Sequence, residues 1–387
     1  MEKPKIRFKG YQEDWEQRKF GEIVEKYEDP IETPTEGYTR LGIRSHAKGT
    51  FHSYVEKGKE LETAKMFRVA ADKFIVNITF GWEHAVAITD ENDAGKLVSH
   101  RFPQYSFNAG MNPNFFRYLI LDENFKHHLE LSSPGGAGRN RVLKLSDMLE
   151  YKMNFPSEAE QKKIAAYFDD LDNLITLHQR KCEETKILKK YMLQKMFPQN
   201  GHSVPEIRFS GCTEDWEQRK LGDAVEFLDT MRKPLEGAKR IPGPYPYYGA
   251  SGIVDYVDGY LFDEELILLS EDGANITDRN YPVCFLASGK YWVNNHAHVL
   301  RTKQENENNF ICNSLERKDY TQYNTGMAMP KLNKETCKKI PISCPGFEEQ
   351  KKIGDYFRSL DHLITLHQQK CDELRNIKKF MLQNMFI

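Results

Sequence analysis

The sequence predicts an α+β fold with two α/β domains separated by two long antiparallel coiled-coil helices and an internal pseudo-two-fold repeat. Three observations predict this architecture. Residues 161–197 and 350–386 align without a gap at a shift of 189, and 24 of their 37 positions are identical. Residues 4–25 and 205–226 align at a shift of 201, with 15 of 22 positions identical. The segments between these repeats differ, which indicates a duplicated scaffold that holds two different domains.

The two longer repeats predict long amphipathic helices. Both lack proline, and their apolar residues recur at alternating steps of four and three. About 37 residues at ~1.5 Å each make a rod of about 55 Å. Such a helix cannot cover its own apolar stripe, so its expected partner is its twin. The predicted seam consists of Ile164, Phe168, Leu171, Ile175 and His178 from the first copy and Ile353, Phe357, Leu360, Ile364 and His367 from the second.

The repeats divide the chain into four parts. Residues 1–155 and 201–344 are the predicted α/β domains, and residues 156–200 and 345–387 are the predicted helices. A short linker at 197–205 favours antiparallel pairing of the helices, which would place the two domains in inverted orientation. Double-stranded DNA has a matching local two-fold symmetry, so one chain would act like a dimeric reader of two unlike half-sites.

Local patterns predict the elements inside each domain. In the first, residues 38–53 predict a loop with exposed donors, residues 74–89 predict two strands, and residues 115–132 predict one helix. In the second, residues 245–262 predict short strands joined by Gly and Asp turns, and residues 289–301 predict one further strand. The middle section of the second domain, residues 227–344, therefore carries more strand and turn signals than that of the first.

Composition limits the class of protein. The 387 residues carry a net charge of −2, so any basic surface must be local. Seven cysteines without a C-x-x-C pair indicate reduced thiols rather than a disulfide framework. The first residues are charged, and no run of about 18 apolar residues occurs, so neither a secretory signal nor a membrane span is expected. These features predict a cytoplasmic protein.

Two motifs occur once in each half of the chain. W-E-Q-R-K-x-G lies at 15–21 and 216–222, and P-x-x-x-E-Q-K-K-I lies at 156–164 and 345–353. Both helices also contain I-T-L-H-Q and end in M-L-Q. With these motifs and its order of variable and repeated segments, the chain resembles the specificity subunit of a type I restriction–modification enzyme over essentially its whole length.

That resemblance implies a set of roles. The two α/β domains would be target-recognition domains, and the two helices would be conserved spacers. Two modification (methyltransferase) subunits would dock on this scaffold, and restriction (motor-nuclease) subunits would join them. The family's specificity subunit performs no chemistry, so S-adenosylmethionine, ATP and Mg are expected on partner subunits, with no cofactor in this chain.

Three functions remain as hypotheses at this point. The first is DNA recognition at a bipartite, asymmetric site, with two adenine methyltransferase subunits and the restriction subunits positioned there. The second is a coiled-coil assembly adaptor whose variable domains bind proteins. The third is a self-contained methyltransferase or nuclease, which the motifs disfavour. Residues 112–115 read N-P-N-F where an adenine methyltransferase has N-P-P-F, and no G-x-x-x-x-G-K-[ST] loop occurs.

The candidate DNA-binding residues are basic, amide or hydroxyl side chains in the loops and short strands expected in each domain. Arginine suits bidentate contact with guanine, asparagine suits adenine, and lysine suits phosphate. A solvated surface loop is the alternative reading for each. In the first domain the candidates are Arg40, Arg44, His46, Lys48, Arg139, Asn140 and Arg141. In the second they are Tyr247, Tyr248, Ser251, Asn275, Lys290, Asn294, Asn295, His296 and Lys331.

The helices carry two further candidate features. His178 and Cys182 lie four residues apart, as do His367 and Cys371. Antiparallel pairing would bring His178 to Cys371 and Cys182 to His367, and two Cys with two His can hold zinc. The favoured reading is that these residues set the register of the seam, with no metal. The exposed faces, including Leu177 and Leu366, are the expected docking surface for methyltransferase subunits.

Overall fold

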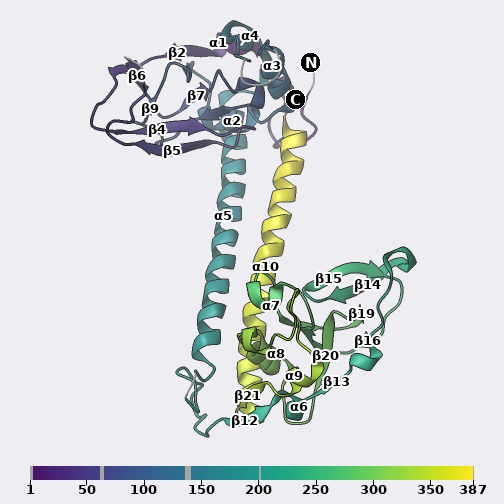
Figure 1. Ribbon diagram of the computed structural model, residues 1–387. Helices are drawn as coiled ribbons and strands as arrows, with labels where there is room; N and C mark the ends of the chain where they lie inside the picture. Colours follow the sequence, from purple (N-terminus) through teal and green to yellow (C-terminus); the bar gives the residue numbers. More distant parts are fainter. Residues whose placement is uncertain (1–2, 62–64, 136–140, 200–201, 387) are drawn as a thin grey trace. The chain divides into compact units, whose positions relative to one another are not determined.

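A computed structural model describes residues 3–61, 65–135, 141–199 and 202–386 (Figure 1). Among these residues it shows helices, strands and two very long helices, so the predicted α+β class is confirmed. None of the described helices combines the length and the apolar content that crossing a membrane requires.

The chain forms two compact units. Unit 1 consists of Met1–Leu177 and Cys371–Ile387, and unit 2 consists of His178–Lys370. The long helices are α5 (Glu158–Lys195) and α10 (Phe347–Met385), and Figure 1 shows both as continuous helices. Each long helix therefore contributes one part to each unit. Both helices begin two residues beyond the predicted boundaries at 156 and 345.

The described residues of unit 1 form three sheets and four short helices beside its parts of α5 and α10. A two-stranded sheet pairs β1 with β11, a four-stranded sheet has the order β2-β10-β7-β8, and a five-stranded sheet has the order β3-β6-β9-β4-β5. The strands are β1 (Glu16–Lys19), β2 (Val24–Tyr27), β3 (Pro30–Glu32), β4 (Tyr38–Ile43), β5 (Thr50–Val55), β6 (Lys65–Arg68), β7 (Lys73–Val76), β8 (Val86–Ile88), β9 (Leu97–Val98), β10 (Gln104–Phe107) and β11 (Lys152–Phe155). The short helices are α1 (Phe20–Ile23), α2 (Pro113–Leu119), α3 (Glu123–Leu131) and α4 (Leu145–Leu149), with a 3₁₀ turn η1 (Gly81–Glu83).

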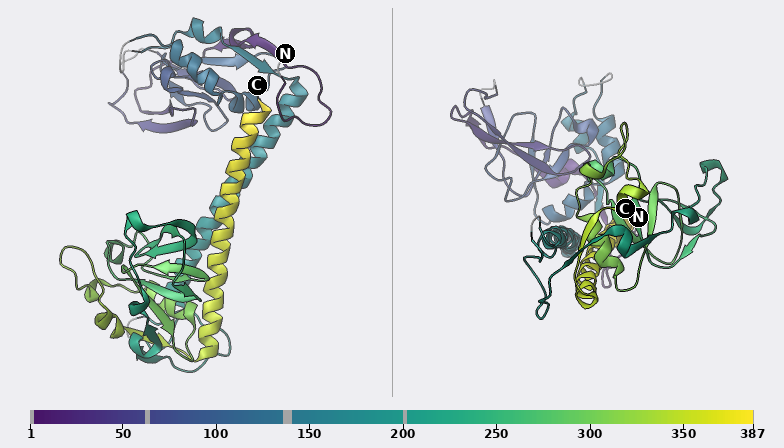
Figure 2. Two further views of the ribbon diagram at one scale, coloured as in Figure 1. Left: turned by 90° about the vertical axis from the view of Figure 1, so that its right-hand side faces the viewer. Right: turned by 60° about the horizontal axis from the view of Figure 1, so that its bottom comes forward.

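Unit 2 repeats this plan with a different third sheet. Its sheets have the orders β12-β21, β13-β20-β17-β18 and β15-β14-β19-β16, and Figure 2 shows them beside α10. The strands are β12 (Glu217–Lys220), β13 (Val225–Phe227), β14 (Pro242–Gly249), β15 (Gly252–Val257), β16 (Phe262–Asp263), β17 (Leu266–Ser270), β18 (Cys284–Ala287), β19 (Lys290–Val293), β20 (Ala297–Thr302) and β21 (Pro341–Cys344). The helices are α6 (Leu221–Ala224), α7 (Asn275–Asp278), α8 (Asn308–Glu316) and α9 (Lys334–Lys338), with 3₁₀ turns η2 (Asp229–Met231), η3 (Gly237–Lys239) and η4 (Thr321–Tyr323).

The internal repeat is confirmed at the level of strand register. In unit 1 Val24 pairs with Phe107, and in unit 2 the equivalent Val225 pairs with Thr302. The first two sheets of each unit thus form a shared scaffold. The third sheets differ, with five strands in unit 1 and four in unit 2. This difference explains why the repeat is lost in the middle of each half.

A repeated glycine keeps two short helices close together in each unit. A Cβ on Gly21 would lie 3.1 Å from the Cβ of Leu149, and one on Gly222 would lie 3.1 Å from the Cβ of Lys338. The glycine in both W-E-Q-R-K-x-G motifs therefore lets α1 approach α4 and lets α6 approach α9. Because both contacts are tight, an alanine here would have to push the neighbouring helix away.

Antiparallel pairing of the long helices is evident in each unit separately. In unit 1 the Nζ of Lys378 lies 2.6 Å from a carboxylate oxygen of Asp172, and Cys371 Sγ donates to the Ile175 carbonyl oxygen at 3.7 Å. In unit 2 Lys189 makes the same ion pair with Asp361 at 2.6 Å. Lys378 and Lys189, like Asp361 and Asp172, are equivalent at a shift of 189. The predicted antiparallel coiled coil is therefore built from the same contacts in both units.

Aromatic side chains join the long helices to the α/β part of each unit. In unit 1 the ring of Phe168 lies 4.9 Å from Tyr118 and 5.8 Å from Phe386, measured between centroids. In unit 2 the ring of Phe197, which follows α5, lies 6.0 Å from Phe357 on α10 and 5.3 Å from Phe310 on α8. Burial of such side chains is the dominant stabilising contribution, at roughly 1.5–3 kcal/mol for each large apolar side chain.

Three of the segment predictions are wrong in detail. Residues 38–53 form the β4–β5 hairpin rather than a loop, because a regular antiparallel register joins Tyr38 to Val55 through Ile43 to Thr50. Residues 115–132 form two helices, α2 and α3, since the carboxylate of Asp122 caps a new helix by accepting from Phe125 N. Residues 289–301 form two strands, β19 and β20, separated by a turn.

Candidate nucleic-acid interface

Unit 1 contains a large cavity beside the β4–β5 hairpin. Its volume is about 660 Å³. The lining residues come from β4, β5, the segment around η1 and the segment between β9 and β10, so contacts distant in the sequence build it. They are Arg40, Leu41, Gly42, Ile43, Ser45, Phe51, Leu61, Asn77, Thr79, Phe80, Glu83, Ser99, His100, Arg101 and Phe102.

Two arginines give this cavity its basic character. Arg40 lies on β4, and Arg101 lies in the segment that leads into β10. Among the described residues, neither guanidinium has a hydrogen-bond or ion-pair partner, whereas most exposed arginines of the chain have one. Gly42 lies next to the ring of Phe51, which a Cβ would approach to 2.3 Å. Glycine therefore allows this aromatic ring to pack directly against β4.

The other predicted residues of unit 1 fall into three groups. His46 and Lys48 are exposed in the turn after β4. Arg44 is held locally, because its guanidinium donates to the Thr50 carbonyl oxygen and lies over the Phe51 ring at 5.3 Å. Arg141 is also engaged, donating to backbone carbonyl oxygens and lying 5.4 Å from the Trp82 ring. The structure does not bring Arg141 to the cavity, and Arg139 and Asn140 lie outside the described residues.

Sequence reasoning missed seven polar residues of the cavity: Ser45, Asn77, Thr79, Glu83, Ser99, His100 and Arg101. The signal available was the run S-H-R at 99–101, a basic and polar segment between two short apolar runs. The segment 99–101 was missed because only long-range strand pairing brings it close to Arg40. In that pairing β9 lies parallel to β4, with Leu97 opposite Arg40.

In unit 2, four loops meet at one edge of the α/β domain. They are the β14–β15 turn, the segment after β17, the β19–β20 turn and the segment 324–332. Backbone hydrogen bonds join them: Glu271 N donates to the His296 carbonyl oxygen at 2.9 Å, Leu332 N donates to Glu271 O at 2.7 Å, and Gly273 N donates to Pro330 O at 3.1 Å. Ser270 Oγ donates to the Ala250 carbonyl oxygen, which ties in the β14–β15 turn. We call this set of loops the unit 2 loop edge.

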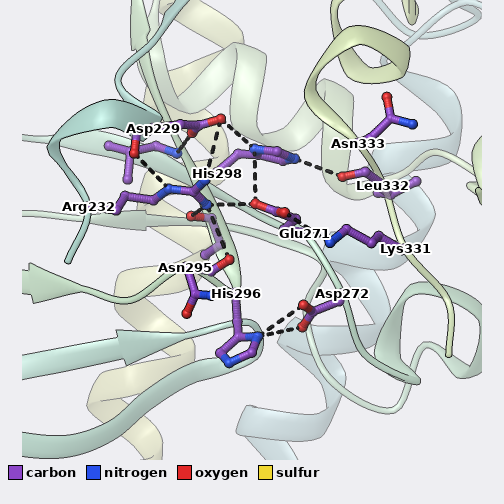
Figure 3. A network of polar contacts seen from close by, with 12 residues as sticks. Asp229, Arg232, Glu271, Asp272, Asn295, His296, His298, Lys331, Leu332 and Asn333 are labelled. Atoms are coloured by element: carbon purple, nitrogen blue, oxygen red, sulfur yellow. Dashed lines mark hydrogen bonds and ion pairs between the residues drawn. The ribbon is translucent and has the colours of Figure 1, made fainter. Parts of the chain in front are cut away.

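A buried polar network supports the unit 2 loop edge (Figure 3). One ring nitrogen of His298 lies 2.8 Å from an Asp229 carboxylate oxygen, and the other lies 2.8 Å from the Leu332 carbonyl oxygen. Arg232 donates to Glu271 at 2.8 Å. Burial alone would raise the pKa of Asp229, but the hydrogen bond and charge of His298, with Arg232, lower it below its ordinary value. Both ring nitrogens of His298 already have hydrogen-bond partners inside the protein. The network therefore serves to hold the loops of the unit 2 loop edge in position.

The loop edge presents several exposed side chains. His296 lies 2.9 Å from Asp272, and Lys331 lies 3.4 Å from Glu271. Met327 and Met329 are exposed at the tip of segment 324–332, and Met327 is fully open to solvent. The segment is held in place because the Asn324 side-chain oxygen accepts from two backbone nitrogens, those of Gly326 and Lys331. The loop is thus anchored by side-chain hydrogen bonds and has an apolar tip, which the sequence did not indicate.

The structure corrects three predicted contact residues of unit 2. Tyr247 is 1% exposed, and its hydroxyl accepts from Leu235 N. Asn275 is buried and donates to Ser270 Oγ and to the Pro282 carbonyl oxygen. Asn294 is buried, and its side-chain oxygen accepts from His296 N. These side chains hold the turns in place and do not present themselves for direct contact.

The remaining predicted residues of unit 2 are distributed unevenly. Ser251, Asn295, His296 and Lys331 are exposed on the loop edge. Tyr248 is half-buried against Phe285 and Tyr291. Lys290 starts β19 and lies over the Tyr260 ring, so it is at the opposite end of that strand from the loop edge.

The helix seam places its ten predicted residues along the contact between α5 and α10. Ile164, Phe168, Leu171, Ile175, Ile353, Phe357 and Leu360 are buried, and Ile364, His178 and His367 are half-buried. The predicted His–Cys pairing is wrong, because the Nδ1 atoms of His178 and His367 face each other at 3.0 Å. Cys182 Sγ instead donates to the Ile364 carbonyl oxygen at 3.8 Å. Among the described residues, no group of three or more His, Cys, Asp or Glu side chains could hold a metal ion.

A duplicated α/β domain joined to long coiled-coil helices, with polar side chains gathered on the loops of each copy, defines a tandem-repeat recognition protein. The family model for the type I restriction modification DNA specificity domain matches residues 12–186 and 213–376. The chain therefore belongs to this family, whose general role is DNA recognition.

Known proteins support this assignment. The chain is 24% identical over 395 aligned residues to a putative type I restriction enzyme specificity subunit of Methanocaldococcus jannaschii, covering 95% of this chain and 91% of that protein. It is 33% identical over 167 residues to a putative type I restriction enzyme specificity subunit of Haemophilus influenzae, covering 43% of this chain and 42% of that protein. The crystal structure of a type I restriction–modification S subunit from M. genitalium matches with a TM-score of 0.66 at 15% identity, covering 100% and 99% of the two chains. That structural likeness shows a shared fold.

Proposed function

We propose that this chain is the non-catalytic DNA sequence-recognition subunit of a type I restriction–modification system. In this proposal it binds a bipartite, asymmetric site in double-stranded DNA and positions two adenine methyltransferase subunits and the restriction subunits there. The observation that carries the proposal is that the same scaffold occurs twice while the third sheet and the polar loops differ. A repeated scaffold suits two identical partners, and two different loop sets suit two different half-sites.

The methyltransferase subunits would dock on exposed apolar residues that are repeated between the units. Unit 1 exposes Leu174 and Leu177 on α5 with Ile377 and Phe380 on α10. Unit 2 exposes the equivalents at a shift of 189, which are Leu363 and Leu366 on α10 with Leu188 and Tyr191 on α5. We call these the two apolar sets. Exposed apolar side chains at equivalent positions indicate a protein contact made twice.

Catalytic chemistry belongs to the partners in this proposal. S-adenosylmethionine, ATP and Mg would be bound by the modification and restriction subunits, and the complex would act in the cytoplasm. The methyltransferase would flip the target adenine out of the duplex, because an enzyme cannot reach the reacting atom of a base that is stacked inside the duplex.

Methylation mapping tests this function. The chain is expressed with its modification subunit, and methylated adenines are mapped across a host genome. The expected result is a two-part motif, and replacing residues 26–155 by those of another specificity subunit should change one half of the motif and leave the other. Methylation without a sequence preference, or DNA binding that depends only on salt, would refute DNA recognition and favour the assembly-adaptor function.

Subunit stoichiometry tests the docking surface. Leu177→Asp should remove one methyltransferase subunit from the complex, Leu366→Asp should remove the other, and the double variant should bind none, as measured by native mass spectrometry. Gln179→Asp and Gln368→Asp add the same charge at exposed polar positions of the same helices and should leave two subunits bound. Two bound subunits in the double leucine variant would place the contact elsewhere.

A further inference from the structure

The two units differ in how their arginines are neutralised. Of the seven arginines in residues 201–344, six pair with a carboxylate at 3.1 Å or less: Arg208, Arg219, Arg232, Arg240, Arg279 and Arg301. The seventh, Arg317, is half-buried and donates to the Leu193 carbonyl oxygen. Unit 2 therefore presents no arginine that is both free and exposed among the described residues of its α/β domain.

Unit 1 shows the opposite pattern. Of the eight described arginines in residues 1–155, three have a carboxylate partner: Arg7, Arg18 and Arg68. Arg44 and Arg141 donate to backbone carbonyl oxygens. The remaining three, Arg40, Arg101 and Arg117, have no side-chain partner among the described residues. Arg117 is half-buried on α2 away from the cavity, whereas Arg40 and Arg101 both line the 660 Å³ cavity.

A free guanidinium has a specific use in DNA recognition. Its parallel N–H groups match the O6 and N7 acceptors on the major-groove edge of guanine. An arginine already paired with a carboxylate would have to break that ion pair first, and the carboxylate would be repelled by the DNA phosphates. Arg40 and Arg101 have no ion pair to break, and Asn77, Thr79 and His100 add further donors and acceptors beside them. The carboxylate in the lining, Glu83, accepts a hydrogen bond from Ser45 and pairs with neither arginine.

The unit 2 loop edge offers a different chemistry. Its exposed side chains include Ser251, Asn295 and two methionines. They also include His296 and Lys331, and each of these two basic residues is paired with an acidic residue. Acidic residues beside the basic ones reduce the positive potential there. Hydroxyl, amide and apolar contacts favour adenine and the thymine methyl group over bidentate guanine recognition.

We propose that Arg40 and Arg101 are the specificity-determining residues of unit 1 and that one or both contact guanine in its half-site, whereas unit 2 reads its half-site without arginine. This proposal rests on DNA recognition as the function of the chain. It names the base that unit 1 prefers and the side chains responsible for that preference.

Arginine-to-lysine variants of the full chain, purified with its modification subunit, test the proposal. Each is used to select binders from a duplex DNA library in which both half-sites are randomised, and the 26–155 exchange identifies the half read by unit 1. In Arg40→Lys or Arg101→Lys, the preference for one G·C pair in that half should fall by roughly 5- to 150-fold, while the other half stays unchanged. Lysine keeps the charge, so general affinity and its salt dependence should change little.

Matched controls are available in both units. Arg18→Lys alters an exposed, carboxylate-paired arginine of unit 1, and Arg301→Lys alters one of unit 2. Neither should change any base preference. Since Arg101 is exposed, Arg101→Gln should fold like the parent, and its melting curve checks this.

Several outcomes would overturn the assignment. Unchanged preferences in both cavity variants, or a uniform loss of affinity for all sequences with a smaller salt slope, would show that the arginines do not read guanine. A G·C preference lost from the unit 2 half in Arg301→Lys would also contradict it. If the parent complex selects no sequence at all, DNA recognition itself fails, which is a separate result.

Discussion

The Nδ1 atoms of His178 and His367 lie 3.0 Å apart, and the two residues are equivalent in the internal repeat. At this distance one ring must donate a proton and the other must accept it, so at least one imidazole is neutral. Burial, followed by the charges of His367, Lys181 and Lys370, lowers the pKa of His178 below its ordinary value. The helix seam of unit 2 therefore contains two imidazoles that cannot both carry a positive charge without repulsion.

This pair predicts weaker stability in mild acid. A lowered folded-state pKa means that the unfolded chain binds the proton more readily. The stabilising contribution is then complete above about pH 6.5, the ordinary histidine value, and is lost as the pH falls below it. The melting temperature should fall between about pH 7.5 and 5.5, and the double variant His178→Gln/His367→Gln should show a smaller fall. Buried His84, whose pKa burial also lowers, accounts for part of the remaining dependence. His127→Gln, at an exposed position, is the control, and an equally steep fall in the double variant would contradict the prediction.

A buried ion pair at the start of each long helix predicts a large loss of stability. Arg7 and Glu160 are joined at 2.7 Å, with the glutamate side chain 1% exposed, and the equivalent Arg208 and Glu349 are joined at 2.7 Å. Arg7→Ala leaves Glu160 buried without its partner, so the free energy of unfolding should drop by about 3–5 kcal/mol. Urea denaturation measures this. Arg18→Ala breaks an exposed pair, and the free energy of unfolding should change little. A similar small loss for both variants would show that the buried pair is replaceable.

The ends of the long helices predict unit-specific effects. Met385 is 1% exposed in the core of unit 1, and its equivalent Met196 is 2% exposed in the core of unit 2. Met385→Ala should destabilise unit 1 by about 2–5 kcal/mol, and Met196→Ala should do the same to unit 2. Hydrogen–deuterium exchange should show faster exchange in 3–155 for the first variant and in 202–344 for the second. Equal effects of either variant on both units would mean that the whole chain unfolds as one.

The methionine-tipped loop predicts a loss of recognition without a loss of folding. A Cβ on Gly326 would lie 1.8 Å from the backbone oxygen of Met329, so Gly326→Ala must change the conformation of segment 324–332. The affinity for the correct site should weaken by roughly 1–3 kcal/mol, the cost of about one mismatched base pair. The melting temperature should change little, because the loop is exposed. Gly237→Ala adds its Cβ into open space and serves as the matched control. An unaltered affinity for Gly326→Ala would exclude this loop from the interface.

The sequence predicts the scaffold well because its signals are local or repeated. The periodicity of Ile164 to His178 defines a helix without any knowledge of tertiary contacts. The repeat then predicts that the second helix has the same contacts, as the Asp172–Lys378 and Lys189–Asp361 ion pairs show. The periodicity does not determine how far one helix is shifted along the other to within one helical turn. The sequence therefore predicts His178 beside Cys371, whereas the structure places it beside His367.

The candidate interface was harder to predict because it depends on long-range pairing. Arg40 was chosen from a glycine- and histidine-rich segment that turned out to be a strand. Its neighbour Arg101 is far away in the sequence and becomes visible only once β4 and β9 pair. Tyr247 and Asn275 carry the right polar groups, but their burial depends on the packing of whole strands. Residue type alone does not distinguish a side chain that contacts DNA from one that supports a loop.

The division of the long helices between the units also sets an order of folding during synthesis. Unit 2 is a continuous stretch, His178–Lys370, and all its contacts can form as soon as that stretch has left the ribosome. Unit 1 begins at the other end of the sequence, yet its core includes Leu374 and Met385, and Ile6 N donates to the Asn384 carbonyl oxygen. The first domain to be translated is therefore the last to be completed. A chain that stops near residue 370 would contain every residue of both α/β domains. It would still expose the apolar core of unit 1 to chaperones and proteases.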